Sequence, residues 1–251
     1  YLLPKRIETD FEVDPIPAAT MVSEPITELY NSYVKLGMGS KLAPLAEFSI
    51  TNKRSKEHSF GAFLRHHSSP GKVSMPGDER VFAGYSLNKA ELFGKQFFEN
   101  SVLKLDLGAN SNTRYFYGYN TQLAEIPPKD SIKKQNFTNL GFNIGFNSTY
   151  IDSSHLNYDF QLEGNYLNDN FNTTENRLKF TSNFDKFFNN FHVGVDAGYT
   201  YIKHQAWQDT LKNNLLKVSP WIGRYGDDWR IQGGINFFTD IVDGNGKARI
   251  Y

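Results

Sequence analysis

His66, His67, Ser68 and Ser69 carry the side chains from which an ester-cleaving enzyme builds its nucleophile. In such a site a histidine removes the proton of a serine hydroxyl, and a third group holds the imidazole in place. The sequence around the four residues offers no recognisable third group. We therefore interpret the segment as the polar end of a strand; an enzyme here would depend on His67 or Ser68.

The two adjacent histidines are also candidate metal ligands. Neighbouring residues of a strand point to opposite faces, so one ion cannot easily reach both imidazoles. The chain has no cysteine, which excludes thiolate metal sites and disulfides. We predict no metal and no cofactor.

Asp159 and Glu163 are the best candidates for a pair of catalytic carboxylates. On a strand they would share one face but stand roughly 13 Å apart, which exceeds the separation that glycosidases use. We expect them instead to pair with Arg177 and Lys179 on the next strand. The sequence therefore predicts a protein that is not an enzyme.

Three further patterns have simple structural interpretations. The segment Gly244–Lys247 lacks the spacing of a phosphate loop and predicts a hairpin turn. The tyrosines at 115–119 could stack on sugars, but they fit an aromatic girdle at a membrane interface better. Asn136, Asn147 and Asn172 match a glycosylation pattern that we attribute to chance.

Apolar and polar residues alternate over unusually long segments, which predicts long two-faced strands. One parity of the segment 156–166 is apolar or glycine, and the other holds Asn157, Asp159, Gln161, Glu163 and Asn165. A soluble strand averages about 5–6 residues, whereas a tilted strand needs about 9–11 to cross a bilayer. The pattern therefore predicts strands that span a membrane.

The predicted fold class is all-β: an antiparallel up-and-down transmembrane β-barrel. We expect an extended periplasmic arm over residues 1–30 and about 11–12 barrel strands over 31–251, as part of a larger barrel. Short periplasmic turns and longer external loops alternate in such barrels. We predict turns at 54–57, 99–101, 151–154, 188–190 and 226–228, and loops at 68–80, 121–135 and 206–212.

Strand parity also predicts which side chains face the barrel lumen. The charged residues of the polar parity form a set of mixed sign: Asp159, Glu163, Arg177, Lys179, Asp185 and Asp196. Such a lumen is either cross-braced and closed or a weakly selective pore.

Composition restricts the function classes. The formal net charge is zero, which argues against a nucleic-acid surface. Mean hydropathy is −0.52, and no stretch approaches the ~20 apolar residues of a membrane helix. The chain starts at Tyr1 without a signal sequence, so either a signal peptide has been removed or the chain is an internal piece; its last residues predict a strand that has just begun, so we expect truncation at that end.

Several segments together resemble a known group of proteins: Leu29–Gly39, Pro44–Glu47, Asn52–Lys56, His67–Ser69 with Gly71, and Tyr117–Tyr119. They resemble outer-membrane β-barrel proteins of Bacteroidota that are often labelled TonB-dependent-receptor-like. The resemblance implies the bacterial outer membrane, lipid and lipopolysaccharide as neighbours, and a barrel that continues further. A TonB-dependent receptor holds a plug in a 22-stranded barrel. Only about 30 residues precede the first predicted strand, so we expect no plug.

We expect a non-enzymatic outer-membrane pore, or a transport-related protein, for small solutes. The alternative is an accessory or structural subunit of an outer-membrane assembly or secretion complex, contacting other outer-membrane or periplasmic proteins. A soluble β-meander is the alternative fold and would be released without detergent.

Overall fold

The computed structural model describes residues 30–52, 55–75, 79–118, 125, 128–150, 154–207, 209–226 and 228–250. The arm predicted over residues 1–30 lies outside these ranges except for Tyr30, as do parts of the predicted loops 68–80 and 121–135.

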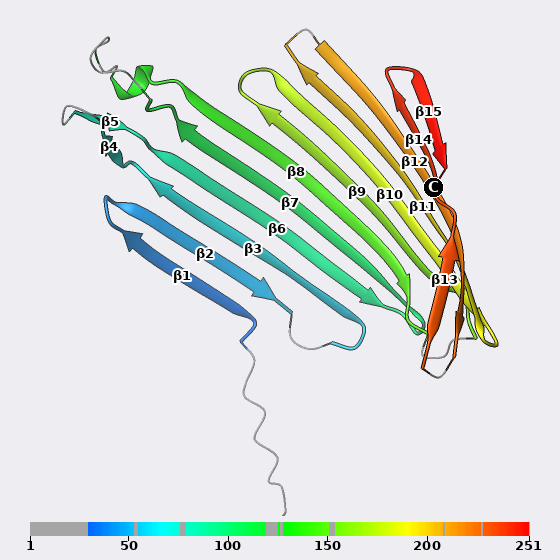
Figure 1. Cartoon of the computed structure of the whole chain (residues 1–251). Coiled ribbons are helices and arrows are strands. Elements are labelled where there is room, and N and C mark those ends of the chain that lie inside the picture. Colours follow the sequence, from blue (N-terminus) through cyan, green and yellow to red (C-terminus); the bar gives the residue numbers. More distant parts are fainter. Residues whose placement is uncertain are drawn as a thin grey trace, which may run out of the picture.

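One antiparallel sheet dominates the described residues, with its strands in chain order (Figure 1). The main strands are β1 (Ser32–Gly39), β2 (Ala43–Thr51), β3 (His58–Ser69), β6 (Tyr85–Phe97), β7 (Ser101–Tyr115), β8 (Lys134–Ser148), β9 (Asn157–Asp169), β10 (Thr173–Phe188), β11 (Phe191–Ala206), β12 (Asp209–Tyr225), β13 (Arg230–Gly234), β14 (Phe237–Val242) and β15 (Asn245–Ile250). The predicted all-β antiparallel meander is confirmed.

Two small elements lie between the long strands. β4 (Lys72–Ser74) and β5 (Arg80–Phe82) form a separate two-stranded sheet within the predicted loop 68–80. The short 3₁₀ helix η1 (Lys129–Ser131) precedes β8. The predicted loop at 206–212 is wrong, because β12 begins at Asp209 and pairs with β11 up to Ala206.

β13 and β14 are two parts of one strand. Trp221 pairs with Gly234 and Val218 with Phe237, so both parts keep the same register against β12. The break falls opposite Pro220, which has no N–H to donate to the ladder. Ile235 N–H still donates to Pro220 O at 3.1 Å. Counted this way, the sheet has about twelve strands, within the predicted range.

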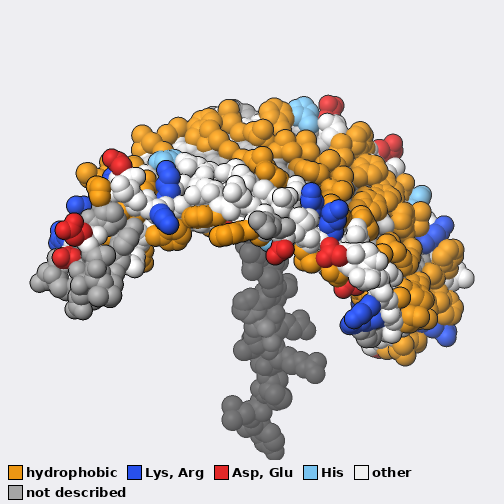
Figure 2. Space-filling model, turned by 90° about the horizontal axis from the view of Figure 1, so that it is seen from above, with side chains coloured by type: hydrophobic (Ala, Val, Ile, Leu, Met, Phe, Trp, Pro, Cys, Tyr) orange, Lys and Arg blue, Asp and Glu red, His pale blue; other side chains and the backbone are white. Residues whose placement is uncertain are grey.

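The sheet is an open arch. Along the described residues, β1 forms one edge and β15 the other, and no pairing joins these edges. Figure 2 shows the arch from its end, with apolar side chains over the convex face. None of the described helices is long and apolar enough to cross a membrane. The predicted antiparallel sheet is therefore present, without the closure that a barrel requires.

A conventional hydrophobic core is missing from the described part of the chain. Val81, Val102 and Ile132 are its buried apolar side chains, whereas Leu36 is 77% exposed and Ile222 is 52% exposed. A soluble domain of this length would bury about 70% of the surface of its unfolded chain. The apolar face of the sheet is thus uncovered.

Candidate functional site

The sheet register separates a polar face from an apolar face. Asp159 stands opposite Asn183, which stands opposite Asp196, and Glu163 stands opposite Lys179. Arg177 and Asp185 share the parity of Lys179 on β10. All six residues predicted to face a lumen therefore lie on one face of the sheet, opposite the apolar convex face of Figure 2.

The apolar side chains of the convex face form a band that crosses the strands obliquely. Its midpoint on β1 is Leu36. A line perpendicular to the strands starts at Leu36 and reaches Thr210 on β12 after nine successive pairings. The apolar run on β12 is Leu216–Ile222, about nine residues further along. With about 3.3 Å per residue and about 4.8 Å between strands, the strands tilt by about 35° from the direction perpendicular to the band. Closed barrels have typical tilts of 35–45°.

Charges on the concave face are paired across neighbouring strands. Lys179 Nζ lies 3.7 Å from Glu163 Oε1, which confirms that predicted ion pair. Arg177, however, stands opposite Asn165, and Asp159 opposite Asn183. The prediction that Asp159 pairs with one of these two basic residues is therefore wrong, because the register separates it from both along the strands.

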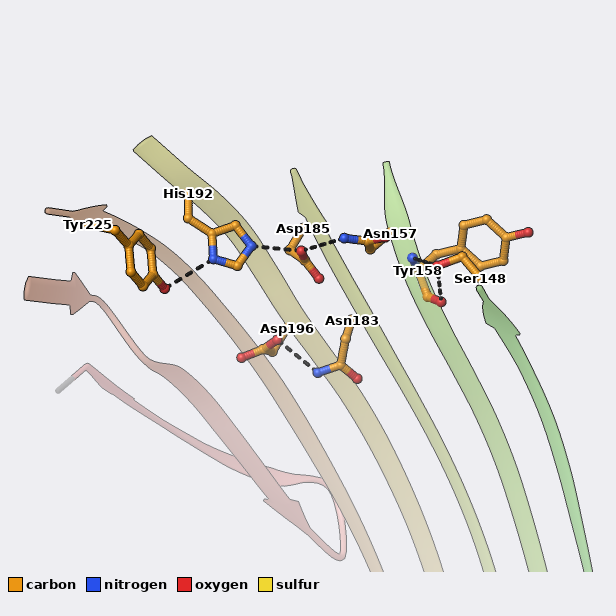
Figure 3. A network of polar contacts seen from close by, with 8 residues as sticks. All are labelled: Ser148, Asn157, Tyr158, Asn183, Asp185, His192, Asp196 and Tyr225. Carbon is orange, nitrogen blue, oxygen red and sulfur yellow. Dashed lines mark hydrogen bonds and ion pairs between the residues drawn. The ribbon is translucent and has the colours of Figure 1, made fainter. Parts of the chain in front are cut away.

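A polar network near the β10–β11 turn was missed in the sequence. His192 Nε2 lies 2.7 Å from Asp185 Oδ2, which also accepts a 3.1 Å hydrogen bond from Asn157 (Figure 3). His192 Nδ1 lies 3.1 Å from the Tyr225 hydroxyl. The side chain of His192 is only 14% exposed. Both imidazole nitrogens are thus engaged, so the network acts as a brace across β9 to β12.

Aromatic rings enclose the same histidine. The Phe187 ring stacks on His192 with centroids 3.8 Å apart, and Trp221 meets the imidazole edge-on at 4.7 Å. The Trp221 ring occupies the space above Gly194, where an added Cβ would lie 2.3 Å from it. The glycine therefore admits the indole, and the cluster packs tightly at this end of the concave face.

A hollow of about 510 Å³ lies in the middle of the concave face. Its charged lining residues are Glu91, Asp106, Glu163 and Arg177. Gly108 and Gly141 also line it, and a Cβ on Gly108 would have no neighbour within 4 Å. Within the described ranges no group of three or more His, Asp or Glu side chains could hold a metal ion. The hollow can therefore accept water and small solutes of either sign.

The histidines and serines of β3 divide between the two faces. His67 Nε2 lies 3.2 Å from the Tyr85 hydroxyl, whereas His66 Nε2 lies 3.0 Å from Ser68 Oγ. His67 and Ser68 therefore lie on opposite faces, whereas His66 and Ser68 share one, because residues two apart share a face of a strand.

The β9–β10 turn, beyond the apolar band, is held by Asp169. Its Oδ1 accepts 2.8 Å hydrogen bonds from the N–H groups of Phe171 and Thr173, and its Oδ2 accepts one from the Gln135 amide. Desolvation alone would raise the pKa of Asp169. The hydrogen bonds outweigh it and lower the pKa below the usual 3.8.

We expect Asp169→Ala to lower the free energy of unfolding at neutral pH by about 1 kcal/mol. Because the pKa is depressed in the folded state, this stability is present above pH 3.8 and is lost as the pH falls through the folded pKa. Equilibrium unfolding of both proteins against pH measures the difference. A difference that persists unchanged below the folded pKa would contradict the prediction.

Comparisons with known proteins identify no relative of this chain. No protein-family model, no curated protein and no solved structure matches this chain.

Proposed function

We propose that this chain forms the wall of an outer-membrane β-barrel whose polar concave face lines a pore for small solutes. The observation that carries the proposal is the single sheet with two faces, one apolar and exposed, the other polar and internally paired. The tilt of about 35° between the strands and the normal of the apolar band fits a wall that crosses a bilayer. Lipid and lipopolysaccharide then cover the convex face.

The same exposure argues against a soluble meander. Val34, Leu36 and Met38 of β1 are each at least 66% exposed, and no second layer covers them within the described residues. Large exposed apolar surfaces are rare in soluble monomers. The resemblance to outer-membrane barrels of Bacteroidota supports the same location.

The mixed charges of the lumen favour weak ion selectivity. In a planar bilayer we expect the closed barrel to which this wall belongs to give stepwise conductance. Changing Arg177 and Lys179 together to Glu should shift the reversal potential toward cations, because both lie on the lumen face. Lys203→Glu is the matched control, since Lys203 has the opposite parity on β11 and pairs with Asn176.

Two results would count against the pore: the absence of conductance from inserted protein, or an equal shift with Lys203→Glu.

An accessory subunit of an envelope complex is the second candidate. The edges of β1 and β15, with which no further described strand pairs, favour it, because an exposed strand edge is a template for pairing with another chain. Gentle detergent extraction followed by mass spectrometry distinguishes the candidates. Stoichiometric partners support the subunit, and a lone barrel supports the pore.

A further inference from the structure

Four side chains on the convex face, Ser68, His66, Asn88 and Ser86, form a connected row beside the apolar band. His66 Nδ1 lies 2.6 Å from Asn88 Oδ1, and His66 Nε2 lies 3.0 Å from Ser68 Oγ. Asn88 Nδ2 donates to Ser86 Oγ at 3.2 Å, so the amide oxygen of Asn88 faces the imidazole. His66 Nδ1 then carries the proton, and Nε2 offers its lone pair to the Ser68 hydroxyl. This is the order of groups in a serine–histidine–acceptor triad.

The strands place these groups without loop contributions. His66 and Ser68 are two residues apart on β3 and therefore share a face. Asn88 stands directly opposite His66 on β6, and Ser86 directly opposite Ser68. Catalytic groups that are built on paired strands are held more precisely than groups on loops.

An apolar groove of about 560 Å³ adjoins the row on the side of the membrane band. His66 and Asn88 line it together with Ala46, Ala90, Ala109, Leu36, Phe48 and Leu64. The three alanines keep the groove open between larger neighbours. Its lining is continuous with the exposed apolar side chains of β1 to β3, so it fits an acyl chain that lies along the sheet.

A second hollow, of about 480 Å³, adjoins the row on the opposite side, toward the loops. Ser68 and Ser86 line it together with Thr113, Lys129 and Lys134. The two lysines bring positive charge to this hollow, and an ammonium is a common partner of phosphate. Ser68 therefore stands between a place for an acyl chain and a place for a phosphate group, as an acyl ester bond does in a phospholipid.

We propose that Ser68, His66 and Asn88 form a hydrolase site for the acyl esters of membrane glycerophospholipids. The proposal rests on the membrane location of the convex face, but it does not require the pore. It revises the sequence-based expectation of a protein without enzymatic activity, because that expectation depended on a missing partner for the histidine. Asn88 is that partner.

The chemistry balances with water as the second substrate. Ser68 Oγ attacks the ester carbonyl while His66 Nε2 takes its proton, and the bond to the glycerol oxygen breaks as His66 returns the proton to that oxygen. Water then attacks the acyl-serine, His66 again takes and returns a proton, and the fatty acid leaves. The Ser86 hydroxyl, which accepts from Asn88, can donate its own proton to the oxyanion. Asn88 is a positioning residue.

The test uses the full chain in mixed micelles of phosphatidylethanolamine, together with a fluorophosphonate probe for activated serines. We expect fatty-acid release and labelling of Ser68. Ser68→Ala should abolish both, and His66→Ala should reduce hydrolysis about 10³-fold or more. His67→Ala is the matched control, because it changes the adjacent histidine on the other face, which lines neither hollow, and we expect it to retain full activity.

The positioning role of Asn88 is tested by a kinetic measurement that a purely structural role would not change. We expect Asn88→Ala to lower kcat about 10–100-fold with little change in KM, and Asn88→Asp to restore most of it. No release and no labelling, or an equal loss in His67→Ala, would overturn the site. If the Ser68→Ala variant still conducts ions, the pore proposal is independent of the hydrolase proposal.

Discussion

Phe180→Arg should destabilise the protein in a lipid bilayer by about 2–4 kcal/mol, or prevent its insertion. Phe180 is 39% exposed and lies near the middle of the apolar band on β10. If water covered this face, an exposed position would accept an arginine at almost no cost. In a bilayer the guanidinium must instead enter hydrocarbon or pull in water. Urea unfolding in lipid vesicles, followed by tryptophan fluorescence, measures the change.

Thr181→Arg is the matched control, because Thr181 is the next residue and points to the concave face. It pairs with Gln161 and Gly198 and is half-buried on that face. We expect a change within about 0.5 kcal/mol. Equal tolerance of arginine at both positions would exclude a lipid-facing convex surface, and with it both the pore and the lipid hydrolase.

Asp185→Ala should lower the free energy of unfolding by about 2 kcal/mol. The change leaves His192 Nε2 and the Asn157 amide without their shared acceptor, although the imidazole stays packed between Phe187 and Trp221. A mostly buried donor that loses its partner retains the full cost of its desolvation. Chemical unfolding in detergent micelles measures the effect.

Asp159→Ala is the corresponding control, with a carboxylate on the same face. Asp159 stands opposite Asn147 and Asn183 and makes no hydrogen bond or ion pair of its side chain with other described residues. We expect its removal to change stability by less than about 0.5 kcal/mol. Equal losses at Asp159 and Asp185 would show that the brace around His192 contributes nothing of its own.

The faces of the strands follow from the sequence because parity is a local property. A strand has a period of two, so each residue of the segment 156–166 is assigned to a face of the sheet as soon as the face of one neighbour is known. The Glu163–Lys179 pair follows in the same way, since a short turn joins their strands. The sequence also contains a signal for the network of Asp185 and His192. Counting outward from the Asn189–Asn190 turn pairs Phe187 with His192 and puts Asp185 on the same face.

The contact of His66 with Asn88 on the neighbouring strand could not be predicted from strand parity. A loop with its own small sheet, β4–β5, separates β3 from β6, so the register of these strands is not set by a tight turn. A shift of one residue would have placed Asn88 on the other face. Closure of the sheet is likewise a long-range property, because it depends on pairing at edges that are far apart in the chain.

The near absence of buried apolar side chains has a consequence for how a cell makes this protein. With Val81, Val102 and Ile132 as the buried set of the described residues, a folded form in water would have almost nothing to hold it together. If the convex face lies in a membrane, as we propose, the chain must travel through aqueous compartments unfolded and shielded by holdase chaperones, and its folding must coincide with insertion. Delivery, rather than intrinsic folding speed, then sets how much of it a cell can accumulate.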